Sequence, residues 1–167
     1  MYQKILLICA GNTCRSAMAA PLLQKMLQEE LGDDWLEGAI LSAGLAAFSG
    51  APASREAEEV MREEGIDLSA HQARVLTHKE IDEADLVIVM TFAQKEAVLR
   101  EYPSAKKKVF PLGEFTIEGA DVSDPFGQGI EVYRQCAAQI KEGLTGMVNW
   151  IKSMNKESGK VIPETKE

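Results

Sequence analysis

The sequence is poor in the residues from which several classes of protein are built. It contains three cysteines, Cys9, Cys14 and Cys136, and two histidines among 167 residues. So few cysteines, odd in number, argue against a disulfide scaffold, and no cysteine or histidine cluster has the spacing of a zinc site. We therefore expect no metal, no cofactor and a fold stabilised by its own hydrophobic core.

Basic residues and long apolar runs are also scarce. Lys and Arg total 18 against 26 Asp and Glu, a net charge of -8. Such a chain lacks the basic face that nucleic acids or anionic membrane surfaces require. It has no apolar run of about 18 residues that could span a membrane, and the run 5–8 is too short for a signal peptide. We expect a cytoplasmic protein that binds neither nucleic acid nor membranes.

Strand and helix patterns alternate along the chain. The hydrophobic periodicity predicts strands at 4–9, 39–43, 85–90 and 108–112, and helices at 16–31, 54–64, 77–84, 91–102 and 130–154. This alternation is typical of an α/β fold, here a three-layer α-β-α arrangement around a four-stranded parallel sheet. We expect one domain over residues 1–154 and a polar, flexible tail over 155–167.

In such sheets, ligands bind at the carboxyl ends of the strands, where the strand order reverses. The first predicted strand is followed by a loop of unusual composition that leads directly into a helix and reads Cys9-Ala10-Gly11-Asn12-Thr13-Cys14-Arg15-Ser16. Successive inward N–H groups and a helix N-terminus both bind anions. Gly11 and Asn12 tolerate the positive φ that a tightly curved loop demands.

This loop has the chemistry of a phosphoryl-transfer site. Arg15 offers a planar fork that matches two phosphoryl oxygens, and the backbone of residues 10–14 supplies further donors. The same positive potential stabilises a thiolate at Cys9. We therefore predict that Cys9 is the nucleophile, that Arg15 and the loop bind the phosphoryl group, and that Ser16 donates a hydrogen bond to the thiolate.

The leaving group of such a transfer needs a proton, which a carboxylic acid on a loop can supply. Asp121 and Asp124 are the candidates late in the sequence. Asp124 is favoured because Pro125 stiffens the backbone next to it. We predict that Asp124 is the general acid and then activates the water that hydrolyses a phosphocysteine.

The loop resembles that of the low molecular weight protein tyrosine phosphatases. Three further segments carry the resemblance over most of the chain: Ser42-Ala43-Gly44, His71-Gln72-Ala73-Arg74 and Asp124-Pro125-Phe126-Gly127. The resemblance independently selects Asp124 as the acid. It also implies that His71 joins Asn12 and Ser16 in supporting the loop, and that Cys14 forms a reversible disulfide with Cys9 under oxidants. Cys136 is expected to pack in the core.

Two features bear on the substrate. Thr13 matches the branch of the family that hydrolyses phosphoarginine in bacterial proteins, whereas tyrosine-specific members usually carry an apolar residue there. A single aromatic residue, Phe126, follows the Asp-Pro pair, and a pocket with one aromatic wall suits a planar guanidinium. The sequence therefore favours a phosphoarginine phosphatase acting on phosphorylated proteins, with a tyrosine phosphatase as the alternative.

Two other functions fit less well. A thiol-coupled arsenate reductase shares the loop, but it needs a further pair of closely spaced cysteines, and only Cys136 lies outside the loop. An inactive module that only binds phosphoproteins would not need a nucleophile and an acid. The presence of Cys9, Arg15 and Asp124 together argues against it.

Overall fold

The computed structural model describes residues 2–32 and 39–157. Its strands are β1 (Ile5–Cys9), β2 (Ile40–Gly44), β3 (Leu86–Val89) and β4 (Val109–Pro111). Its helices are α1 (Arg15–Leu31), α2 (Arg55–Glu63), α3 (His78–Glu83), α4 (Phe92–Glu101) and α5 (Ile130–Glu157), with the 3-10 turns η2 (Pro103–Lys107) and η3 (Leu112–Phe115). Each predicted strand and helix is present, with ends shifted by a few residues.

The four strands form one parallel sheet in the order β2-β1-β3-β4. All residues of β1 and β3 are buried, because these central strands are covered on both faces. The chain adds β2 on one side of β1 and then β3 on the other. The strand order thus reverses at β1. Ligands of parallel sheets bind at the carboxyl end of the strand where the order reverses, and in this sheet Cys9 lies there.

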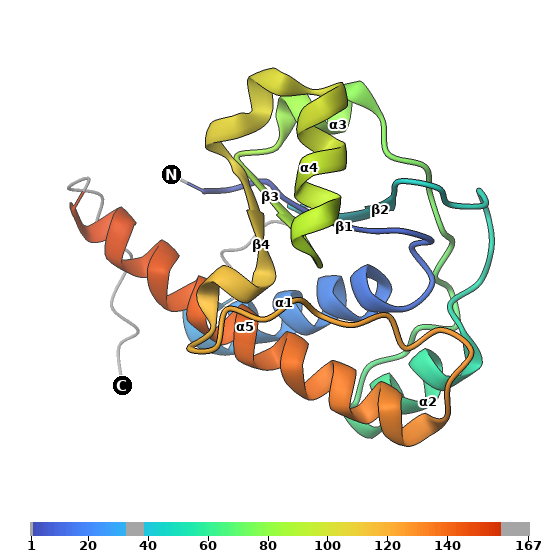
Figure 1. Cartoon of the computed structure of the whole chain (residues 1–167). Coiled ribbons are helices and arrows are strands. Elements are labelled where there is room, and N and C mark those ends of the chain that lie inside the picture. Colours follow the sequence, from blue (N-terminus) through green and yellow to red (C-terminus); the bar gives the residue numbers. More distant parts are fainter. Residues whose placement is uncertain (1, 33–38, 158–167) are drawn as a thin grey trace.

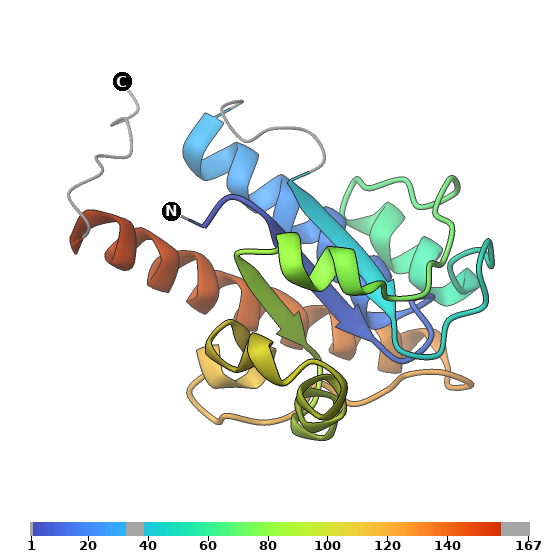
Figure 2. The same cartoon turned by 90° about the horizontal axis from the view of Figure 1, so that it is seen from above.

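Helices cover both faces of the sheet, which confirms the three-layer prediction. Figure 1 shows α1, α2 and α5 below the sheet and α3 and α4 above it, and Figure 2 shows α3 in front of the strands and α4 end-on near the tip of β3. Alternate residues of β1 point to opposite layers. Leu7 and Cys9 pack with α1, α2 and α5, while Leu6 and Ile8 pack with α3 and α4.

Local sequence signals explain where several helices begin. Ser54, Thr77 and Thr91 are N-caps whose hydroxyl oxygens accept backbone N–H groups of the first turn. Thr77 and Glu80 form a capping box at the start of the predicted helix 77–84, since the Glu80 side chain accepts the Thr77 N–H. Helix α1 ends at Gly32, where φ is 74°, as glycine readily allows.

The structure differs from the predicted boundaries at two places. Strand β4 is only three residues long, because the chain turns into η3 at Leu112. Helix α5 continues through Glu157, three residues beyond the predicted end, so residues 155–157 belong to the helix and not to the expected tail. The rest of that tail, 158–167, lies outside the described residues. No helix within 2–32 and 39–157 is long and apolar enough to cross a membrane.

Candidate active site

The Cys9–Ser16 loop turns sharply between β1 and α1. Asn12 has φ 54°, and it is the only described non-glycine residue with a positive φ. An Asn tolerates this left-handed conformation better than most residues. Gly11 does not share it, so of the two residues predicted to tolerate a positive φ only Asn12 adopts one. One left-handed residue is enough because α1 begins only three residues later.

Two hydrogen bonds converge on the sulfur of Cys9. Ser16 Oγ lies 2.9 Å from Cys9 Sγ, and the Asn12 backbone N–H donates to Sγ over 3.2 Å. Cys9 is itself almost fully buried, as are both partners. One buried sulfur atom thus has two hydrogen-bond partners within the loop and the first turn of α1.

Asn12 joins the loop to two other segments, the end of β2 and residues 71–74. Its side-chain amide donates to Ser16 Oγ at 2.8 Å and to Ser42 Oγ at 3.0 Å, while its Oδ1 accepts the Arg74 N–H at 3.0 Å. His71 Nε2 donates to the Asn12 carbonyl oxygen at 2.6 Å, and because a carbonyl only accepts, Nε2 carries the proton. Asn12, Ser16 and His71, predicted to support the loop, thus lie in one network.

The end of β2 fits closely against the loop. Leu45 N–H donates to the Cys9 carbonyl and Ala46 N–H to the Ala10 carbonyl, at 3.0 and 2.9 Å. A Cβ atom at Gly44 would lie 2.6 Å from the Ala10 oxygen. The glycine of the Ser42-Ala43-Gly44 segment is therefore required by the close approach of two backbones.

Arg15 is buried beneath the loop at the start of α1. Its Nη1 donates to the Val122 carbonyl at 2.9 Å, and its Nη2 lies 3.5 Å from Asp124 Oδ2. Its Nε is the one buried side-chain nitrogen or oxygen in the described residues that has no hydrogen-bond partner. A buried guanidinium with an unpaired N–H is costly unless an anion completes it, so this arginine is suited to bind phosphoryl oxygens.

Asp124 lies on the segment between η3 and α5, close to Arg15. Its side chain is 51% exposed, while the neighbouring Pro125 is buried. Asp124 Oδ1 accepts the Phe126 N–H at 3.1 Å, which turns the chain directly after the proline. Phe126, two residues after Asp124, has a side chain that is 72% exposed.

The remaining loop residues face α2 and α5. Cys14 Sγ and the Tyr133 hydroxyl share a 3.2 Å hydrogen bond, and Thr13 Oγ1 lies 3.7 Å from Cys14 Sγ. Burial raises the pKa of Tyr133 well above its usual range, and the contact with Cys14 acts in the same direction. The Ser54 N–H donates to the Thr13 carbonyl at 2.9 Å, so the N-cap of α2 also holds the loop.

Cys136 on α5 is buried, as expected for a core residue. Its Sγ lies 3.8 Å from the Ser123 carbonyl, just before Asp124. Burial raises the pKa of this thiol to about 12, although the Arg15 guanidinium acts in the opposite direction. Cys136 is therefore a neutral thiol at physiological pH and not a second nucleophile.

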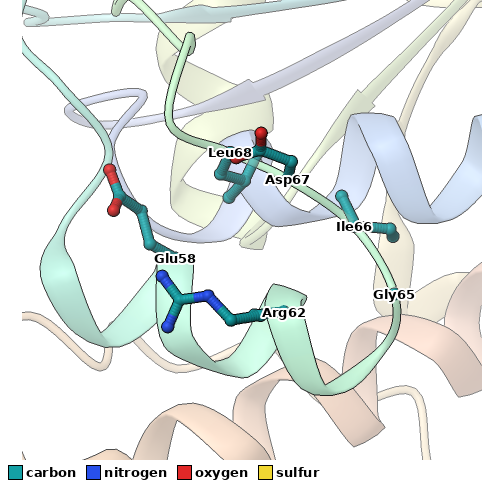
Figure 3. Close-up of a pocket in the computed structure, with 6 residues that line it drawn as sticks. All are labelled: Glu58, Arg62, Gly65, Ile66, Asp67 and Leu68. Atoms are coloured by element: carbon teal, nitrogen blue, oxygen red, sulfur yellow. The ribbon is translucent and has the colours of Figure 1, made fainter.

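A separate hollow of about 350 Å³ lies between α2 and the loop that follows it (Figure 3). It is lined by Glu58, Arg62, Gly65, Ile66, Asp67 and Leu68. None of the residues predicted for phosphoryl chemistry lines it, and its charged side chains are of both signs. We do not assign it to the reaction.

The structure thus brings together every predicted loop residue and Asp124, but it also adds residues that the sequence did not single out. Ser42 bonds Asn12, Tyr133 bonds Cys14, and the Val122 carbonyl accepts from Arg15. Ser42 carried a signal, because it precedes Gly44 at the end of a strand next to β1. Tyr133 and Val122 resembled ordinary core residues in the sequence.

Comparison with known proteins agrees with this geometry. The family model described as low molecular weight phosphotyrosine protein phosphatase matches residues 4–160. A protein-arginine-phosphatase from Geobacillus stearothermophilus is 40% identical over 144 residues, which cover 84% of this chain and 90% of that protein.

Solved structures have the same fold. The YwlE arginine phosphatase from Geobacillus stearothermophilus superposes with a TM-score of 0.81 at 35% identity, covering 94% of this chain and 97% of that one. A low molecular weight protein tyrosine phosphatase from T. tengcongensis gives 0.81 at 38% identity, with coverage of 89% and 99%. The chain therefore belongs to the low molecular weight phosphotyrosine protein phosphatase family and is a cysteine-based protein phosphatase.

Proposed function

We propose that this protein hydrolyses phosphoarginine in phosphorylated proteins, with Cys9 as nucleophile and Asp124 as general acid and base. The observation that carries the chemistry is the pairing of a buried, hydrogen-bonded Cys9 with a buried Arg15 whose Nε has no protein partner. The observation that carries the choice of substrate is Thr13 at the loop, together with a single exposed aromatic residue, Phe126.

In the first step the Cys9 thiolate attacks phosphorus, so an S–P bond forms as the P–N bond of phosphoarginine breaks. Arg15 and the loop amides neutralise the equatorial oxygens. Asp124, half exposed and 3.5 Å from Arg15, gives its proton to the departing guanidinium nitrogen. The products of this step are a free arginine side chain and a phosphocysteine.

In the second step Asp124, now a carboxylate, takes a proton from water while the water oxygen attacks phosphorus. The S–P bond breaks and inorganic phosphate leaves. The sulfur departs as a thiolate, which the Ser16 hydroxyl and the Asn12 N–H stabilise from 2.9 and 3.2 Å. The cycle consumes one water and restores both side chains.

The surroundings of Thr13 support a guanidinium as the leaving group. Its hydroxyl makes only a long contact with Cys14 Sγ, at 3.7 Å, so an oxygen remains to accept a guanidinium N–H. Phe126 is 72% exposed and offers a face on which a planar cation stacks. The similar arginine phosphatases from Geobacillus stearothermophilus support the same substrate class.

A tyrosine phosphatase is the second candidate. The tyrosine phosphatase from T. tengcongensis is 38% identical, and the exposed Phe126 ring could equally contact a phenol. The two candidates share every chemical step and differ only in the leaving group.

The test compares two peptides that differ only in carrying phosphoarginine or phosphotyrosine. We expect a higher kcat/KM on phosphoarginine, and Thr13→Ile to shift the ratio of the two activities toward phosphotyrosine by about tenfold. Thr13→Val is the matched control, because it removes the hydroxyl and keeps the shape. An unchanged ratio in Thr13→Ile would count against the proposed specificity.

The mechanism has its own test. Cys9→Ser should abolish turnover while inorganic phosphate still binds, and Asp124→Ala should slow hydrolysis by about 100- to 10,000-fold. Full activity in Cys9→Ser would disprove the mechanism.

A further inference from the structure

The segment 121–125, which carries the proposed acid, has no regular secondary structure, so its backbone groups must find partners elsewhere. The Val122 N–H donates to the Met90 carbonyl at the end of β3, at 2.9 Å, and the Val122 carbonyl accepts from Arg15. Val122 and Pro125 are buried, while the two residues between them are exposed. The course of this segment is therefore set by contacts with neighbouring elements.

Asp121 makes two of these contacts. Its Oδ1 accepts the backbone N–H of Phe92 at 2.9 Å, and its carbonyl accepts from Gln139 Nε2 on α5 at 2.8 Å. Phe92 is the first residue of α4, where the unpaired N–H groups and the helix dipole favour a carboxylate. In Figures 1 and 2 the orange trace of this segment passes the N-terminal end of α4.

The capping box of α4 leaves this amide to Asp121. Thr91 Oγ1 accepts the Gln94 N–H, and Gln94 Oε1 accepts the N–H groups of Thr91 and Met90. The capping box thus binds the N–H groups of Met90, Thr91 and Gln94, and it leaves the N–H of Phe92 to another acceptor. Asp121 completes the helix start from a segment 29 residues away.

Asp124 depends on the backbone behind it. Among residues 2–32 and 39–157, its carboxylate has two polar partners, the Phe126 N–H of its own turn and, at 3.5 Å, Arg15, and it is 51% exposed. Neither contact fixes the position of the Asp124 carboxylate relative to the Cys9 sulfur. A proton donor must lie within hydrogen-bond reach of the leaving atom, and a misplacement of about 1 Å can cost 100-fold in rate.

We propose that Asp121 is a positioning residue for the phosphatase reaction: by binding the first amide of α4, its carboxylate holds the segment that presents Asp124 to the Cys9 loop. This inference rests on the proposed function, in which Asp124 protonates the leaving group. Asp121 does not touch the substrate. Its effect falls on the steps that use Asp124, as acid in the first and as base in the second, and kcat/KM reports the first of them.

The experiment measures kcat/KM on a series of aryl phosphates whose phenols range from strongly to weakly acidic. Weakly acidic phenols need the general acid, and strongly acidic ones leave without it. We expect Asp121→Ala to lose about tenfold on the least acidic phenol and less than about twofold on the most acidic one. Inhibition by inorganic phosphate should stay within about twofold of wild type, because the Cys9 loop is intact.

Two sets of variants separate positioning from a general structural defect. Asp121→Asn keeps the accepting oxygen and should restore most of the activity, whereas Glu118→Ala, which removes an exposed charge three residues before Asp121, should change nothing. Phe92→Pro removes the backbone N–H that donates to Asp121, where Asp121→Ala removes the acceptor. Proline is well tolerated at the first position of a helix, and Thr91, at φ -138° and ψ 157°, already has the extended conformation that precedes a proline.

Phe92→Pro should therefore show the same dependence on the leaving group as Asp121→Ala, while Phe92→Ala, which keeps the N–H, should not. The double variant Asp121→Ala/Phe92→Pro should lose no more than either single variant. An equal loss on all phenols, or no loss, in Asp121→Ala would overturn the inference. Asp124→Ala is the reference. If its loss of activity does not depend on the leaving group either, the proposed acid is wrong and the inference falls with it. If the loss depends on the leaving group in Asp124→Ala but not in Asp121→Ala, only the role of Asp121 is refuted.

Discussion

At the scale of single residues, Asn12 decides the shape of the Cys9 loop. It is fully buried, it adopts φ 54°, and its side chain satisfies hydrogen-bonding groups of Ser16, Ser42 and Arg74. The conformational tolerance was readable from the sequence, since Asn is a residue type that adopts positive φ. The bonds to Ser42 and Arg74 were not, because these two partners lie 30 and 62 residues away.

The two roles of Asn12 can be measured separately. Asn12→Ala should lower the free energy of unfolding by about 3 kcal/mol, since it strands buried polar groups and forces an alanine into the left-handed region. Asn12→Gly loses the same hydrogen bonds without the steric strain, so it should be about 1 kcal/mol more stable than Asn12→Ala. Urea unfolding measures the free energy of unfolding of both variants. If Asn12→Gly were less stable than Asn12→Ala, the positive φ at residue 12 would be unimportant for stability.

Cys136 gives the protein a sensitivity to alkaline pH. Its pKa rises from an ordinary value of 9.0 to about 12 on folding, so the folded state holds the proton more tightly than the unfolded state. Its contribution to stability is therefore complete below about pH 9 and is lost as the pH rises toward 12. Between pH 9 and 10 the wild type should lose about 1 kcal/mol more than Cys136→Ala in urea unfolding. Parallel losses in the two proteins would contradict this assignment.

At the scale of elements, the fit between α5 and η3 depends on glycine. A Cβ atom at Gly146 would lie 2.0 Å from the Phe115 carbonyl oxygen, which belongs to the backbone and cannot rotate away. Gly146→Ala should therefore destabilise the protein by about 2 kcal/mol or more, although alanine is the better helix former.

Asn149→Ala, at an exposed position of the same helix, is the control and should change the free energy of unfolding by less than about 0.5 kcal/mol. Thermal or urea unfolding measures the free energy of unfolding of both variants. A Gly146→Ala variant as stable as the control would mean that η3 moves freely away from α5. The segment after η3 carries Asp124, so such freedom would also bear on the position of the proposed acid.

At the scale of the whole molecule, binding at the loop should stabilise the fold. Inorganic phosphate that binds only the folded state raises the free energy of unfolding by about 2.7 kcal/mol at 100 times its Kd. We expect this gain in the wild type and in Asp124→Asn, and its loss in Arg15→Ala, measured at constant ionic strength. Equal stabilisation of Arg15→Ala would show that phosphate acts through general salt effects and not through the loop.

The single domain over 1–154 and the cytoplasmic location remain predictions from the sequence. The fold, in contrast, followed from local patterns that the structure confirms: buried runs for β1 and β3, and helices that begin next to Ser54, Thr77 and Thr91. The errors lie at β4 and at the end of α5, where no strong stop signal stands in the sequence. Helix and strand ends of this kind are set by packing and not by local preference.

What the sequence determined by itself is the chemistry of the loop and the order of the elements. Both depend on neighbours in the chain: the Cys9–Ser16 string, the hydrophobic periods and the caps. What only the tertiary structure decided is which distant residues complete the site: Ser42, Arg74, Val122 and Tyr133 around the loop, and Asp121 at the start of α4. Parallel strands bring their carboxyl ends to one edge of the sheet, but the pairs that form there depend on strand register and helix packing, which no local stretch of sequence encodes.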